Sequence, residues 1–287
     1  MTIPAGELLQ VARLRIRAAV EPMIGERLPP AVRPPGDDGL FGPASVTWKV
    51  HGNSSMMVGG LRALLLQTMH PLAMAAVAEH SNYKEDPWGR LRRTAGFLRT
   101  TTFGSTAAAE AAIRSVRKVH ERIRGVAPDG RPYAASDPHL LAWIHATEVD
   151  SFLTAFRRYG TETVSAAEAD RYVAEMAGVA RRLGVERPPV TTAELKAVLD
   201  GFRPELVVGR QARDAVRFLL LPPVQWSARP AYGVIAASAV TALPGWARSK
   251  LHIPPLIGAD LLVRPTGFAL LRTLDWALAP QDDDRAA

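Results

Sequence analysis

The sequence contains no cysteine in its 287 residues. This absence excludes disulfides, thiolate ligation of haem or zinc, iron–sulfur clusters and thiol nucleophiles. A chain without cysteine fits a reducing compartment. Residues 1–20 carry charges through their apolar stretch and show no signal-peptide cleavage site, so we expect a cytoplasmic protein.

Motifs of several common enzyme classes are also missing. The sequence has no Walker loop, no glycine-rich dinucleotide motif, no G-x-S-x-G elbow and no H-E-x-x-H zinc motif. None of its seven histidines follows an acidic residue by three positions, so the Glu-x-x-His ligands of di-iron bundles are absent. The uncharged run over residues 63–78 is shorter than the roughly 20 apolar residues of a membrane-spanning helix. We expect it to form a buried helix kinked at Pro71.

What the sequence does contain is typical of a helical globular protein. It is 47 % hydrophobic and 22 % charged, and capping residues, apolar positions at helical spacing and terminal glycines recur along it. We predict an all-α fold, with one multi-helix domain of about ten helices and a long N-terminal arm. The arm, a helix followed by a proline-rich stretch, covers residues 1–40, and the helical domain covers residues 41–280.

The net charge of +7 permits an anionic partner, although solvated basic helix faces explain it equally well. We expect no nucleic-acid partner. The stretch 230–248 contains glycine and prolines among small residues, which favours a buried helix over attachment to a membrane surface.

One histidine interrupts the apolar face of a basic helix, RSVRKVHERIRG. His120 lies four residues after Val116 and three before Ile123, and Arg117 and Arg124 flank the same face. A buried imidazole needs partners for both nitrogens. His120 is therefore either a core histidine bonded to a carbonyl group or a ligand of a metal or haem. Without cysteine or Glu-x-x-His pairs, haem held by one histidine suits these residues better than a bare metal ion.

Two further groups of polar residues invite a functional interpretation. Arg90, Arg93 and Thr94 share one helical face, which is either a solvated basic surface or a face turned inward. His145 and Glu148 share an otherwise apolar face, as a polar pair that joins two helices or as part of a pocket wall.

The segments GGLRALLLQTMHPLAMAAVAEHS, DPWGRLRRT, TFGSTAAAEAA, VRKVHERIRG and HATEVDSFLTAFRRYG resemble, in this order, one oxygenase family. That family contains bacterial rubber oxygenase (latex-clearing protein) and the fungal mpaB-type oxygenases, and the resemblance extends over roughly residues 40–275. It implies a catalytic domain that binds haem b and uses dioxygen. In rubber oxygenase the haem histidine lies in an R-x-x-H-x-x-x-R pattern, and Arg117, His120 and Arg124 match it. The resemblance therefore implies His120 as the iron ligand and the two arginines as cofactor-binding residues.

The resemblance also implies a distal side. The family has an R-x-x-K-T motif there, matched by Arg90 and Thr94, but Arg93 stands in place of the lysine. An arginine does not readily lose its proton and ligate iron. The family uses a pocket glutamate as a base, for which Glu79 is the nearest candidate, and we place His145 among the residues that contact the cofactor.

The sequence therefore predicts a haem-b-dependent oxygenase acting on a small apolar molecule, with dioxygen as its second substrate. Two alternatives stay open. The chain could be a haem carrier or sensor without turnover, or a family member without haem that has a structural or interaction role.

Overall fold

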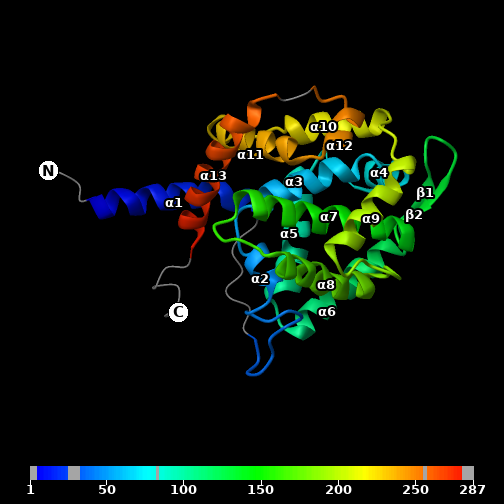
Figure 1. Cartoon of the computed structure of the whole chain (residues 1–287), viewed down its shortest axis with the longest axis horizontal. Coiled ribbons are helices and arrows are strands. Elements are labelled where there is room, and N and C mark those ends of the chain that lie inside the picture. The colour runs from blue at the N-terminus through cyan, green and yellow to red at the C-terminus, as the bar shows by residue number, and fades with distance from the viewer. Residues whose placement is uncertain (1–4, 25–32, 82–83, 255–256, 280–287) are drawn as a thin grey trace.

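The computed structural model describes residues 5–24, 33–81, 84–254 and 257–279 (Figure 1). Over these residues the chain forms thirteen α-helices, two short 3-10 helices and one sheet of two short strands, which confirms the predicted all-α fold class. The elements are α1 (Ala5–Ile24), α2 (Val46–His51), α3 (Met56–Gln67), α4 (Pro71–His80), α5 (Pro87–Phe103), α6 (Thr106–His120), β1 (Arg124–Val126), β2 (Pro132–Ala134), α7 (Pro138–Tyr159), α8 (Ala166–Leu183), α9 (Thr192–Phe202), η1 (Arg203–Glu205), α10 (Arg210–Leu220), η2 (Trp226–Ala228), α11 (Arg229–Ala242), α12 (Gly245–Lys250) and α13 (Ala259–Leu278).

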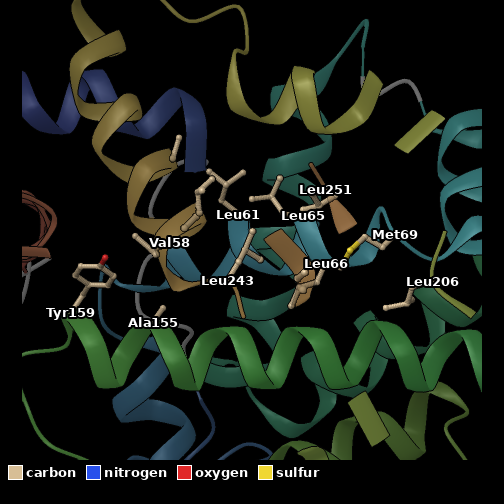
Figure 2. Close-up of a cluster of buried hydrophobic side chains, with 14 of the residues drawn as sticks. Val58, Leu61, Leu65, Leu66, Met69, Ala155, Tyr159, Leu206, Leu243 and Leu251 are labelled. Atoms are coloured by element: carbon tan, nitrogen blue, oxygen red, sulfur yellow. The ribbon is translucent and has the colours of Figure 1, made fainter. Parts of the chain in front are cut away.

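Helix α7 runs through the middle of the molecule and contributes to both main parts of the core (Figure 1). On one side its side chains pack against α3, α11 and α13, and Figure 2 shows Leu61, Leu65 and Leu66 of α3 in this cluster. On the other side they pack against α2, α8 and α9. Burial on several faces explains why α7 is apolar through most of its length.

Helices α3 and α7 approach each other closely. A Cβ atom at Gly59 would lie 2.8 Å from Cδ1 of Phe152, so only glycine fits there without displacing α7. One turn further along, the buried guanidinium of Arg62 forms an ion pair with Asp150 at 2.8 Å and donates to the Ser151 hydroxyl at 2.7 Å. The contact between these two helices is therefore both tight and polar.

The predicted kink at Pro71 is a complete break between two helices. Helix α3 ends at Gln67, α4 begins at Pro71, and the two axes differ by 107°. His70 caps α4 through its Nδ1 atom, which lies 3.5 Å from the amide nitrogen of Ala73. No single helix among the described residues is long and apolar enough to cross a membrane; α3 and α4 together reach that length and composition, but with this bend between them.

The helix that carries His120 is shorter than the sequence indicates. We predict a helix that continues to Gly125, but α6 ends at His120 and Arg124 is the first residue of β1. The backbone of residues 124–126 pairs with residues 132–134 in an antiparallel hairpin, in which Gly125 lies opposite Tyr133. The backbone N–H and C=O groups of residues 124–126 form hydrogen bonds within this hairpin instead of continuing the helix. Arg124 is consequently not on the same helix as Arg117, as the spacing suggested.

The N-terminal helix lies against the C-terminal one. Arg13 and Arg17 of α1 donate to the carbonyl oxygens of Ala277 and Ala279 at distances between 2.6 and 3.2 Å. Residues 25–32, the centre of the predicted proline-rich arm, lie outside the described residues. After them, Arg33 stacks on Trp48, with 4.3 Å between its guanidinium carbon and the ring centroid.

Candidate functional site

Helices α5 and α6 form a hairpin whose open end collects most of the predicted site residues. Only Gly104 and Ser105 separate the two helices, and the helices pack against each other, so they run antiparallel. The first turns of α5, with Arg90, therefore lie at the same end as the last turn of α6, with His120. Helix α4 also ends there, because only residues 81–86 separate it from α5.

Asp86 and Ser105 fix where the two helices of this hairpin begin. The Asp86 carboxylate accepts a hydrogen bond from the amide of Gly89 at 2.8 Å, with Pro87 at the first helical position. The Ser105 hydroxyl accepts one from the amide of Ala108 at 3.2 Å. Both are side-chain N-caps of the kind that the sequence predicts.

His120 is half-buried at the end of α6, and burial lowers the pKa of its imidazole below the usual 6.5. Burial therefore favours the neutral ring, which keeps a nitrogen lone pair. Among the residues that the structure describes, neither ring nitrogen of His120 has a hydrogen-bond or ion-pair partner. The carbonyl bond expected for a purely structural core histidine is thus missing from the described part of the chain.

The two arginines of the motif are exposed. Arg117 approaches the carbonyl oxygen of Arg182 at 3.5 Å, and Arg124 donates to the carbonyl oxygen of Glu121 at 3.3 Å. Within the described ranges, no carboxylate lies at ion-pair distance from either guanidinium. Both arginines are therefore able to pair with an anionic group.

The predicted distal residues of α5 occupy its first turns. Arg93 is exposed and lies 3.5 Å from the Asp86 carboxylate. Thr94 is also exposed and donates to the carbonyl oxygen of Arg90 at 3.1 Å, while Arg90 itself is half-buried. The structure thus turns Arg93 and Thr94 toward solvent and leaves Arg90 as the member of the motif closest to the interior.

Glu79 belongs to a small polar cluster at the end of α4. Its carboxylate accepts a hydrogen bond from the Tyr133 hydroxyl, which also lies 3.1 Å from Nε2 of His80. Burial, followed by the contact with Glu79, raises the pKa of Tyr133 to about 12. A side chain at Gly125 would collide with the Tyr133 hydroxyl, so the glycine in β1 allows this contact. Tyr133 lies beyond a turn in the sequence, and no local pattern points to it.

His145 is buried and Glu148 is half-buried on α7, but they do not form the expected pair. Burial lowers the pKa of His145 to about 4 and raises that of Glu148 to about 7. No hydrogen bond joins the two among the described residues, and Nε2 of His145 is buried there without a partner. No described polar contact connects His145 with His120.

A histidine that sequence reasoning missed lies beside Tyr172, whose pKa responds to Glu148. His51 of α2 contacts the Thr102 hydroxyl at 2.8 Å through Nδ1 and the Tyr172 hydroxyl at 3.0 Å through Nε2. Burial lowers its pKa to about 3, and burial together with Glu148 raises the pKa of Tyr172. These residues come from different helices, so no spacing in the sequence signals the cluster.

Two cavities differ in their position relative to the open end of the α5–α6 hairpin. One of about 640 Å³ lies between α13 and the segment that joins α7 to α8, and its lining contains no histidine. Another of about 220 Å³ lies between the end of α4 and α10, with Ser81 and Lys84 in its wall. The second cavity adjoins the link between α4 and α5, next to the first turns that carry Arg90.

The fold and this arrangement define a helical protein with a candidate cofactor ligand at the end of a helix hairpin. Comparison with family models gives the class a name: the chain belongs to the family described as ER-bound oxygenase mpaB/B'/rubber oxygenase, catalytic domain, whose model matches residues 48–276. This confirms the resemblance noted in the sequence, and the match includes all the site residues discussed above. The family is one of oxygenases. Comparisons with curated proteins and with solved structures gave no match.

Proposed function

We propose that the chain is a haem-b-dependent oxygenase, in which His120 would hold the haem iron, with a small apolar molecule and dioxygen as substrates. The observation that carries the proposal is the state of His120. Its imidazole is half-buried at the open end of the α5–α6 hairpin and unpartnered among the described residues, and burial lowers its pKa.

The residues around His120 suit a haem group in their chemistry. A neutral imidazole supplies the lone pair that iron requires. Arg117 and Arg124 are exposed and have no described carboxylate partner, so they can pair with the two propionates. Ile123, which follows His120 by three residues, packs against the buried cluster of Ala75, Ala127, Tyr133 and Leu140, so the surroundings of His120 are apolar on this side.

Haem bound at this site would supply the activation of dioxygen. The side chains of this protein would position and protect the reactants. Arg90, with Thr94 on the same part of α5, would donate hydrogen bonds to polar atoms of the reactants. Glu79, whose carboxylate is oriented by the Tyr133 hydroxyl, would accept a proton from the substrate. His145, which has a buried unpartnered nitrogen, would contact the cofactor or a water molecule beside it.

The experiment is a haem titration of the wild-type protein and of His120→Ala. The wild type is expected to bind one haem with a defined Soret band, and the variant to bind it weakly with a shifted band. Added imidazole should restore the band position, because it can occupy the space vacated by the ring. Haem-free His120→Ala should lose only about 1–3 kcal/mol of stability, as for another partly buried truncation.

His252→Asn is the matched control, because His252 is exposed and has a positive φ of 56° that asparagine tolerates. Its haem spectrum should equal that of the wild type. A folded wild-type protein that takes up no haem would overturn the proposal. Haem binding without consumption of dioxygen in the presence of a reductant and apolar substrates would identify a carrier or sensor instead.

A further inference from the structure

Three potential metal ligands converge at a second place, where the break between α3 and α4 meets the start of α7. They are His70, His139 and Glu205, and one ligand atom of each lies within 4.8 Å of the other two. Nε2 of His139 is 2.9 Å from both carboxylate oxygens of Glu205, and Nε2 of His70 is 3.4 Å from one of them.

The surrounding structure holds these three side chains in place. Phe202 packs against both imidazoles, with ring centroids 4.5 Å from His139 and 6.1 Å from His70. The amide of Val207 donates to the carbonyl oxygen of Met69 at 2.8 Å, which ties the segment after Glu205 to the residue before His70. The cluster is therefore built from rigid elements rather than from adjacent surface side chains.

The buried imidazole of His70 points to a ligand independently of the clustering. Its side chain is only 1 % exposed, and Nε2 is buried without a hydrogen-bond partner among the described residues. The Glu205 oxygen at 3.4 Å is near enough for electrostatic attraction but does not satisfy that nitrogen as a hydrogen bond. A buried polar atom in this state is costly, and coordination of a metal ion by Nε2 would remove that cost.

We propose that His70, His139 and Glu205 bind one divalent transition-metal ion of the zinc class. Two imidazoles and a carboxylate form a donor set that Zn²⁺ and Fe²⁺ favour over Mg²⁺. Ligand atoms bound tetrahedrally at about 2.0–2.1 Å lie about 3.3 Å from one another. The 3.4 Å between His70 and Glu205 already meets this spacing, and the 2.9 Å between His139 and Glu205 requires a small opening.

Three protein ligands leave one tetrahedral position for water or another small ligand. The side chain of His139 is 55 % exposed and that of Glu205 is 37 % exposed, whereas His70 forms the buried wall. The open position thus faces solvent.

Metal binding would move one proton within the His70 ring and replace existing hydrogen bonds. Nδ1 of His70 accepts from the amide of Ala73, so in the metal-free neutral ring the proton resides on Nε2. An ion at Nε2 moves this proton to Nδ1 and removes the cap of α4. At 3.5 Å that cap is longer than the other side-chain caps of the described helices, which measure between 2.8 and 3.2 Å. The ion also replaces the contact between His139 and Glu205.

The test is calorimetric titration of the metal-stripped full chain with Zn²⁺, in wild type, His139→Asn and Glu205→Gln. The wild type is expected to bind one Zn²⁺ per chain and to unfold at a higher temperature when loaded. Each variant should bind at least tenfold more weakly and lose the rise in unfolding temperature. Mg²⁺ should give no comparable binding.

His252→Asn is again the control and should bind Zn²⁺ as the wild type does, because His252 is exposed and outside the cluster. Absence of stoichiometric binding in the wild type, or Zn²⁺ binding as tight as that of the wild type in both ligand variants, would overturn the proposal. Haem uptake measured on the same variants should be unchanged, so the result is independent of the role of His120.

Discussion

Arg62 of α3 and Asp150 of α7 form an ion pair at 2.8 Å, with the arginine side chain only 4 % exposed. Asp150→Ala would leave the guanidinium buried without its counter-charge, which costs about 3–5 kcal/mol. Chemical denaturation should therefore show a large decrease in the free energy of unfolding. Asp129→Ala removes a carboxylate from an exposed pair with Arg131 and should leave the denaturation midpoint nearly unchanged. Equal effects of the two substitutions would contradict the structural role of Arg62.

Two adjacent glycines in α3 should respond to alanine in opposite directions. At Gly59 a Cβ atom would lie 2.8 Å from the Phe152 ring and 3.1 Å from the Ser151 carbonyl oxygen, whereas at Gly60 nothing lies within 4 Å. Gly59→Ala should destabilise the protein by about 1–3 kcal/mol through overpacking. Gly60→Ala should stabilise it by roughly 0.5–1 kcal/mol through helix propensity. Thermal unfolding of both variants tests the close approach of α3 and α7, and a Gly59→Ala variant as stable as the wild type would contradict that approach.

Glu148 should make the folded state less stable as the pH rises. Its folded pKa of about 7 exceeds its ordinary 4.5, so between these values the folded state retains a proton that the unfolded state has released. Stability therefore falls as pH rises through this window, by about 3 kcal/mol in total, and stays low above it. The glutamine of the Glu148→Gln variant cannot ionise, so this variant should lack this pH-dependent loss of stability.

The measurement is the difference in unfolding free energy between Glu148→Gln and wild type at pH 5 and at pH 7.5. His51 and His145, whose folded pKa values are lowered, make the folded state more stable as the pH rises toward 6.5. Their contribution is the same in the variant and the wild type, so it cancels when the two unfolding free energies are subtracted. The variant should gain relative stability at the higher pH. Glu186→Gln, at an exposed position, is the control and should show no such change. A pH-independent difference for Glu148→Gln would show that the carboxyl group titrates normally.

Arg93→Lys tests the outward orientation of the α5 motif. Arg93 is 68 % exposed and lies beside Asp86, so a lysine there should remain at the surface. The ferric spectrum of haem-loaded protein is expected to equal that of the wild type. A new spectrum typical of a nitrogen ligand on the second face of the iron would show instead that this side chain reaches the cofactor.

Much of the helical framework was predictable, because helix boundaries depend on nearby residues. Asp86 followed by Pro87, and Ser165 followed three residues later by Glu168, are local patterns typical of helix N-termini, and the structure has a helix start at both. The five segments quoted above, of which the one around His120 is the fourth, also indicate the family from sequence alone. The position of the helix end was not predictable, because α6 stops where a strand eight residues further along pairs with residues 124–126.

The sequence by itself determined the fold class, the family and the residue types available for chemistry, since these depend on composition and local spacing. Only the tertiary structure decided which polar groups meet. The ring of His70, which caps α4, also lies against His139 and Glu205 from two other segments. His145 and Glu148, one helical turn apart, do not bond to each other. Such contacts depend on the orientation in which whole helices pack against one another. The periodicity of residues along the chain does not encode that orientation.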